Sequence, residues 1–253
     1  TIGSSRKGVL LRSTMLAVQF AIASFFIIGS YVVYSQVNHL IAKDPGFRAD
    51  QVVSVYYRNP YDFKVPGFKK IIAVKYEHIK EQVRAIKGVE AVAANTAGVG
   101  EGSNFFTGYG YNGRFYSMQN MVGDFGLTEM LQIKIKEGRP LSPHFAEDTI
   151  SSVLLNESAV KFLGIKNPVG ATLDWEEGRK LRIVGITEDF HINGPHQKIM
   201  PVILYHYKTV DWMLQNAHHI YVKLDPEKRE EALAAIEKLW REEVDPDYPF
   251  NYY

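Results

Sequence analysis

The sequence contains no cysteine among its 253 residues. Disulfide bonds, zinc sites built from thiolates and cysteine nucleophiles are therefore excluded together. A domain of this chain that folds outside the cytoplasm must be held together by packing alone. Basic and acidic residues nearly cancel, with a formal net charge of +1, so the composition gives no reason to expect a nucleic-acid partner.

Charge is also missing locally, because no Asp, Glu, Lys or Arg lies between Arg12 and Lys43. Within this gap, LAVQFAIASFFIIGSYVVYSQ supplies the roughly 20 apolar residues that a helix needs to cross a bilayer. Its polar residues are too sparse to form the polar face of a soluble helix. It is too long for a signal peptide and continues without an A-x-A-like break into Tyr31, Tyr34 and Gln36. We predict a transmembrane helix at residues 15–40. A buried helix of a soluble core and an uncleaved export signal are the alternatives.

The basic residues before this run predict its orientation in the lipid bilayer. Arg6, Lys7 and Arg12 precede it, and positive charge beside a span is retained on the cytoplasmic side. Residues 1–14 are therefore expected to be cytoplasmic. Residues after about position 40 are expected to lie outside the cytoplasm.

Strand and helix patterns alternate after the run. Residues 51–57 are β-branched and aromatic, which is typical of a strand. Residues 68–87 place apolar side chains at alternating steps of four and three, which indicates one apolar helix face. Gly88 is expected to end that helix, and residues 89–97 are predicted to form a second strand.

A similar unit closes the chain. Residues 220–224 alternate as a strand, Asp225 and Pro226 are typical of a helix start, and an apolar helical stripe follows. Together the two units predict an α+β fold. Its first part is a split ferredoxin-like, porter-type α/β subdomain built from residues 44–97 and 218–253.

The segment between the units, residues 98–217, is rich in glycine and aromatic residues and is predicted to be an inserted β-rich subdomain. Its expected strands are residues 105–111, 115–122, 133–136, 151–155, 180–187 and 202–207. A helix is expected at residues 156–163, because Asn156 can cap its start and Gly164 its end. This cap gives Asn156 a structural role, although NES at this point fits a glycosylation sequon.

One loop collects residues that could carry chemistry. EDFHINGPHQ places Asp189, His191 and His196 close together, and two imidazoles with a carboxylate can bind zinc. Their spacing is that of a turn and matches no metal-ligand pattern, so a structural turn is the preferred interpretation. The glycine-rich stretch GVGEGS at 98–103 lacks the lysine and the helix of a phosphate-binding loop. Since no nucleophile motif is present either, we expect no enzyme and no cofactor.

Several stretches resemble one family, in the order in which they occur there. LAVQFAIASFFIIGSYVVYSQVNHLIAKDPGF, followed by QVVSV, resembles the start of the second half of large ABC transporter permeases common in Bacteroidetes, the MacB and FtsX-like group. Similar segments follow at GDFGLTEMLQIKIKEGRPLS, VLLNESAVKFLGIKNPVGATL and VGITEDFHINGPHQKIMPVIL. In the first of these, the family's central glycine is replaced by Leu131 or a neighbour. The stretch DYPFNYY resembles the segment before the family's second span, which implies a fragment of a longer permease.

The resemblance implies a function as well as a fold. It implies a MacB-like periplasmic core domain in the cell inner membrane, without catalytic residues. The implied partners are a cytoplasmic ABC ATPase, a second permease half or a second copy, and a periplasmic or outer-membrane protein. The expected role is mechanotransmission, or export of a lipoprotein, peptide or antibiotic. The alternative is a membrane-anchored extracytoplasmic sensor or ligand-binding domain without transport.

Overall fold

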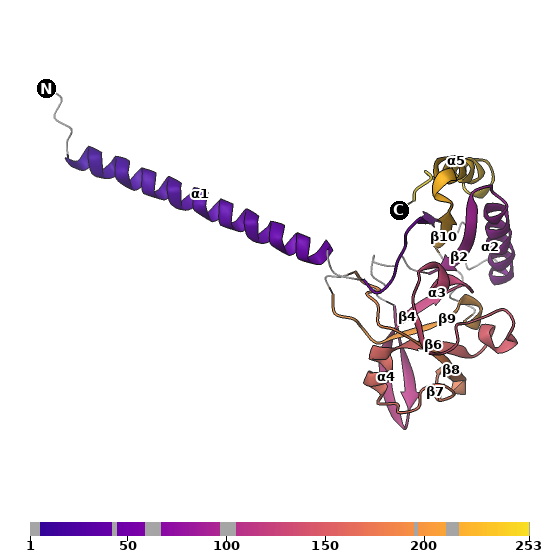
Figure 1. The fold of residues 1–253 in the computed structure, drawn as a ribbon. Helices are drawn as coiled ribbons and strands as arrows, with labels where there is room; N and C mark the ends of the chain where they lie inside the picture. The colour runs from indigo at the N-terminus through magenta and orange to yellow at the C-terminus, as the bar shows by residue number, and fades with distance from the viewer. Residues whose placement is uncertain are drawn as a thin grey trace. The chain divides into compact units, whose positions relative to one another are not determined.

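The computed structural model describes residues 6–41, 45–58, 67–96, 105–194, 197–210 and 218–252 (Figure 1). It divides the chain into two units, Thr1–Asp44 and Pro45–Tyr253. The glycine-rich stretch 98–103 lies outside the described residues.

The first unit contains one long helix, α1 (Arg6–Ile41). Its segment Gly8–His39 is long and apolar enough to cross a membrane, and none of that segment is buried inside the structure. This finding agrees with the predicted transmembrane helix. The helix is also longer than predicted, because it already begins at Arg6 in the segment 1–14.

The second unit begins with a small antiparallel sheet. Strands β1 (Val52–Tyr56) and β2 (Val89–Asn95) both pair with the central strand β10 (His219–Leu224), so that β1 and β2 run parallel to each other. On its other edge, β1 forms an isolated bridge between Val55 and Tyr252. This order is the one expected for a split ferredoxin-like fold, and the predicted α+β class is confirmed.

Two helices cover one face of this sheet, α2 (Phe68–Arg84) and α5 (Arg229–Leu239). Directly opposite residues of neighbouring strands point to the same face, and Val53 lies opposite Val222, which lies opposite Val92. These valines share one core with the apolar stripe of α2, which is buried as its period predicted. The buried residues of that stripe are Ile72, Tyr76, Ile79 and Val83.

Helix α2 ends three residues earlier than predicted. It stops at Arg84, and Gly88 instead forms the turn into β2 with a φ of 91°. A side chain at Gly88 would lie 2.8 Å from Cβ of Lys228, so glycine is required there for close approach as well as for backbone shape. The Asp225 carboxylate caps the following 3₁₀ turn η5 (Pro226–Lys228), as expected from the sequence.

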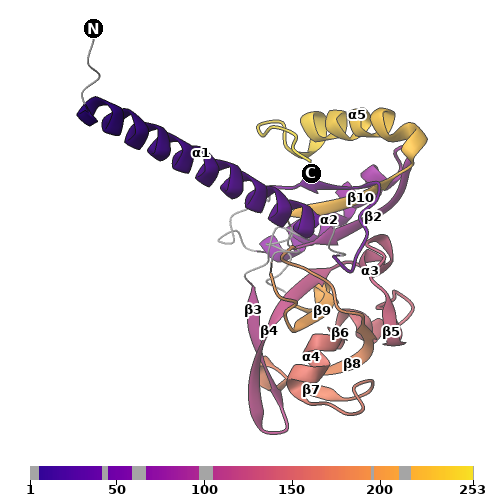
Figure 2. The ribbon, with the colours of Figure 1, turned by 60° about the vertical axis from the view of Figure 1, so that its left-hand side comes forward.

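Six strands between β2 and β10 close into a barrel (Figure 2). In ring order, β3 pairs with β4, β4 with β9, β9 with β6, β6 with β8, β8 with β7, and β7 again with β3. The strands are β3 (Phe106–Tyr111), β4 (Arg114–Gly123), β6 (Ser152–Asn156), β7 (Thr172–Asp174), β8 (Lys180–Thr187) and β9 (Val202–His206). Buried side chains fill the interior, among them Tyr109, Met118, Leu173, Trp175, Ile183 and Tyr205.

Short elements surround the barrel. Strand β5 (Ile135–Gly138) pairs with β8 and lies two residues later than the predicted strand 133–136, because Ile133 is still part of a turn in which its amide binds the Thr128 carbonyl. Strand β7 was not predicted from the sequence; it is only three residues long. The remaining elements are α3 (Leu127–Met130), α4 (Glu157–Leu163), η1 (Ala146–Thr149), η2 (Glu176–Gly178), η3 (Tyr207–Thr209) and η6 (Trp240–Val244).

A second buried cluster lies on the face of the small sheet opposite α2 and α5. It joins Ala93 and Tyr221 of that sheet to α3, to β9 and to Phe190. Phe47, which precedes β1, packs against the same cluster. The sheet and the barrel therefore share apolar contacts on this side as well.

Candidate functional site

The segment that follows α1 is held against a loop of the barrel. Residues 42–44 lie outside the described part of the chain, and Pro45 is the first residue of the second unit. The carbonyl of Pro45 accepts a hydrogen bond from the amide of His191, with an N–O distance of 2.7 Å. We call residues 45–47 and their partners 189–191 the linker clamp.

Gly46 makes the closest contact in the linker clamp. Its φ is 75°, a left-handed conformation that glycine adopts without strain. A Cβ atom at this position would lie 2.5 Å from the carbonyl oxygen of Asp189 and 2.8 Å from Cα of Phe190. Both are backbone atoms, which cannot rotate away, so only glycine fits.

The next two residues extend this attachment. The Phe47 ring packs against the second buried cluster, to which Phe190 and Ile192 belong. The amide of Arg48 donates to the carbonyl of Leu131 at 2.8 Å. Residues 45–48 are thus fixed by two backbone hydrogen bonds and by the packing of the Phe47 ring. All of these contacts precede β1, which begins at Val52.

Asp189 fixes the partner loop of the linker clamp to α4. Its carboxylate accepts hydrogen bonds from the Ser158 amide at 2.8 Å and the Ser158 hydroxyl at 2.7 Å. Ser158 lies in the first turn of α4, where backbone amides lack partners within the helix. Asp189 therefore acts as an additional cap for α4.

The three residues predicted as a weak metal site have different surroundings. Both carboxylate oxygens of Asp189 are bound to Ser158. His191 is buried, and its Nδ1 has no hydrogen-bond partner in the structure. His196 lies outside the described residues. Among the residues that are described, no group of three His, Asp or Glu side chains could hold a metal, and a metal role for the loop stays a prediction.

A second polar cluster lies where α2 meets the ends of β4 and β9. Lys80 of α2 is only 3% exposed, and its ammonium group forms ion pairs with Asp124, just after β4, and with Glu77 at 3.0 Å. His206, the last residue of β9, contacts the other oxygen of Asp124 through Nε2 at 3.2 Å. The Tyr207 hydroxyl donates to Glu77. We call these five residues the polar junction.

Hydrogen bonds define the tautomer of His206 in the polar junction. Its Nδ1 accepts from the backbone amide of Lys208 at 3.1 Å, so the proton of the neutral ring is on Nε2. From there it is donated to Asp124. Asp124 also accepts from the Phe125 amide at 2.8 Å, so donors surround its carboxylate.

This environment changes the pKa values of the acids in the polar junction. Burial alone would raise the pKa of Asp124, but the hydrogen bond from His206 and the charge of Lys80 outweigh it and lower the pKa to about 2. For Glu77, burial is likewise outweighed by the Tyr207 hydroxyl and Lys80, and its pKa is lowered. Both carboxyl groups are therefore ionised at neutral pH.

The sequence did not single out the polar junction, although one signal was present. Lys80 follows Ile79 and lies four residues after Tyr76, so it falls on the apolar face of its helix. A lysine on such a face is either exposed at its edge or paired inside. Asp124 and His206 carried no comparable signal. Asp124 is 44 residues away from its partner Lys80 in the sequence, and His206 is 82 residues away from Asp124.

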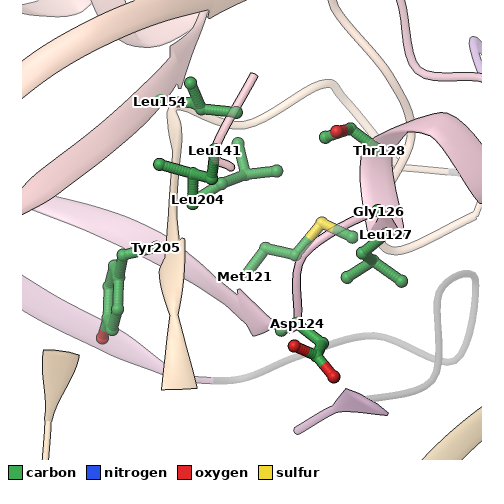
Figure 3. A pocket seen from close by; sticks show the side chains of 10 residues that line it. Met121, Asp124, Gly126, Leu127, Thr128, Leu141, Leu154, Leu204 and Tyr205 are labelled. Carbon is green, nitrogen blue, oxygen red and sulfur yellow. The ribbon is translucent and has the colours of Figure 1, made fainter. Parts of the chain in front are cut away.

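A small cavity lies next to Asp124 (Figure 3). Mostly apolar side chains line it, including Met121, Leu127, Leu154 and Leu204. It has room for about one water molecule. Its size excludes it as a site for a peptide or drug-sized ligand.

Residues that carry the family resemblance have structural roles. Asn156 is fully buried, and its side chain accepts from the amides of Ala159 and Val202 and donates to Met200. It therefore caps α4 as predicted and is inaccessible to glycosylation. Arg139 binds the buried carboxylate of Asp148 through both terminal nitrogens, which organises the loop after β5.

The chain was compared with known protein families and structures. The model of the MacB-like periplasmic core domain matches residues 13–239. A comparison with curated protein sequences gave no match. The family is one of transporter permeases and not a classical enzyme family.

Solved structures of permease domains have a similar fold. The periplasmic region of MacB from Actinobacillus actinomycetemcomitans has a TM-score of 0.60 at 16% identity, covering 85% of this chain and 93% of that one. The extracellular domain of the noncanonic ABC-type transporter YknZ from Gram-positive bacteria has a TM-score of 0.56 at 11% identity, covering 79% and 99%. A domain assigned to a permease protein of Porphyromonas gingivalis has a TM-score of 0.50 at 17% identity, covering 81% and 90%. The family match extends over most of the sequence, and this chain belongs to the MacB-like periplasmic core domain family of ABC transporter permeases.

Proposed function

We propose that this chain transmits movement between a cytoplasmic ABC ATPase and the periplasm, as the membrane helix and periplasmic domain of a permease. The linker clamp is the observation that supports it. Only residues 42–44 separate the end of α1 from the clamp, and three residues extend by roughly 10 Å at most. A connection this short limits how far α1 can move without moving the domain. Displacement of the helix would therefore be transmitted to the domain.

The proposed location is the cell inner membrane. The basic residues before the apolar run support a cytoplasmic N-terminus, and the family match supports a periplasmic position for the unit that follows. Within that unit we propose the boundaries expected from the sequence, with residues 44–97 and 218–253 forming the α/β subdomain and residues 98–217 the insertion.

The proposed partners follow from the family. MacB-like and FtsX-like permeases work with ABC ATPases, and we assign this chain an ATPase of that kind. A second permease half or a second copy would complete the membrane part, and a periplasmic or outer-membrane protein would receive the movement. The movement would serve mechanotransmission or the export of a lipoprotein, peptide or antibiotic.

Inserting a flexible linker tests this proposal in the intact permease. A Gly/Ser segment placed after Lys43 behaves as a random coil and should abolish coupling between ATP hydrolysis and export, while the domain still folds. The same segment inserted between Asn112 and Gly113, in the turn of the β3–β4 hairpin, is the matched control and should leave coupling intact. Normal coupling with the linker after Lys43 would contradict the proposal.

A further inference from the structure

The small sheet and the barrel are joined by few backbone bonds. Strand β2 pairs with β4 at a single position, Asn95 opposite Gly123. Two backbone hydrogen bonds flank this pair, from the amide of Thr96 to Val122 and from the amide of Asp124 to Ala94, both at 2.9 Å. A sheet continued over one residue pair does not by itself define the angle between its two parts.

Apolar packing adds further contacts between the two parts, and these contacts are not directional. Leu127 of α3 packs against β2, and any Cβ atom at Gly123 would lie 2.3 Å from its side chain. Burial of apolar area depends on how much surface is covered and only weakly on orientation. Apolar surfaces of this kind can slide over one another at modest cost.

The polar junction adds a directional contact at the same boundary. Glu77 and Lys80 come from α2, which covers the small sheet, whereas Asp124, His206 and Tyr207 come from the ends of barrel strands and the turn after them. The charges balance, because Glu77 also binds Lys208 at 3.1 Å. Any rotation between the two parts would separate Lys80 from Asp124 and leave buried charges unpaired, which is strongly unfavourable.

We propose that the polar junction is a conformational latch that holds the α/β part and the barrel in one relative orientation. Apolar contacts bring the two parts together, and the ion pairs select the angle. The unit Pro45–Tyr253 consequently moves as one body when the linker clamp is displaced. The latch is a property of the domain and does not depend on coupling to an ATPase.

Distance measurements between two spin labels test the latch. Because the chain has no cysteine, labels can be placed only at introduced thiols, Lys161→Cys on the exposed side of α4 and Glu230→Cys on the exposed side of α5. Double electron–electron resonance on the full chain in detergent should give one narrow distance distribution. Replacing Lys80 with Met, which removes the charge at similar length, should broaden that distribution or add a second maximum.

A pair of tyrosines provides a milder variant and a matched control. Tyr207→Phe removes the hydroxyl that binds Glu77, and Tyr205→Phe removes a hydroxyl of an equally buried tyrosine in the barrel. Tyr207→Phe should broaden the distribution and Tyr205→Phe should not, whether or not Lys80→Met folds. A distribution as narrow in folded Tyr207→Phe as in the parent chain, even with a lowered melting temperature, would overturn the latch and leave the junction a purely stabilising cluster.

Discussion

The absence of a side chain at Gly46 allows the backbone before β1 to contact the backbone of the loop at Asp189 and Phe190. The residue combines a positive φ with contacts to the backbone of Asp189 and Phe190 that no Cβ could share. At Asp124, the decisive factor is the number of donors, since Lys80, His206 and a backbone amide all point at one carboxylate. Both residues owe their importance to contacts made across long stretches of sequence.

Replacing Gly46 with Ala should destabilise the second unit more than the same change at a glycine with open space around it. Gly178 is the matched control, because its φ is 76° and a Cβ atom there would meet nothing within 4 Å. The control should cost about 1 kcal/mol for the left-handed conformation alone, and Gly46→Ala about 1–3 kcal/mol more for the backbone overlap. Urea unfolding measures both, and equal losses would contradict the close contact in the linker clamp.

The stability of the domain should fall in acid through Asp124. Its pKa is about 3.8 without the folded environment and about 2 within it, so its contribution is complete above pH 4 and is lost as the pH falls towards 2. That contribution is about 2 kcal/mol. Asp124→Asn should be less stable than the parent at pH 7 and approach it near pH 2, as measured by urea unfolding across pH. A constant difference at every pH would show that ionisation of Asp124 contributes nothing.

At the scale of elements, caps and turns decide where segments begin and end. Helix α4 is capped twice, by Asn156 at its start and by Asp189 from the loop of the linker clamp. Helix α2 ends at Arg84, and Gly88 in the turn that follows packs closely against Lys228 of η5 and Ala232 of α5. The β3–β4 hairpin turns at Asn112 and Gly113, both with positive φ, as two-residue hairpin loops require.

Asp189→Ala should loosen the first turn of α4 without unfolding the barrel. Loss of a helix-capping side chain costs about 1 kcal/mol, and hydrogen exchange at the amides of α4 should accelerate. Ser158→Ala, which removes only the hydroxyl bond and keeps the amide bond, should have a smaller effect. If Asp189 instead held a metal, the purified chain would retain stoichiometric zinc after dialysis, and Asp189→Ala would release it.

At the scale of the whole molecule, one unit is an apolar helix and the other a folded domain with two cores. The barrel interior is filled with side chains, and the cavity at Asp124 accepts about one water molecule. Neither the filled barrel interior nor this cavity has room for a drug-sized ligand.

Purification of the full-length gene product from its native membrane should recover an ABC ATPase. In mild detergent, mass spectrometry should find the nucleotide-binding subunit in an amount close to that of the permease. Recovery of a signalling protein or a bound ligand, with no ATPase, would support the sensor instead. A sample of the second unit alone, without α1, is the control, and it should recover no ATPase.

Patterns between neighbouring residues were sufficient to predict much of this protein. The apolar run predicted α1, the periods of four and three predicted α2, and spaced motifs indicated the permease family, which the family match confirmed. The α+β class was confirmed as well. The spacing of apolar residues indicates which face of a helix or strand is buried. It does so without identifying the element that packs against that face.

Only the tertiary structure decided the closure of the barrel, the linker clamp and the polar junction. Ring closure depends on pairs such as Gly110 with Asp174, and the clamp joins Pro45 to His191. Asp189 and His191 were singled out as possible metal ligands, but it is their backbone that contacts the linker. Such contacts depend on how the chain's connections bring distant segments together, and no single stretch of sequence contains both partners.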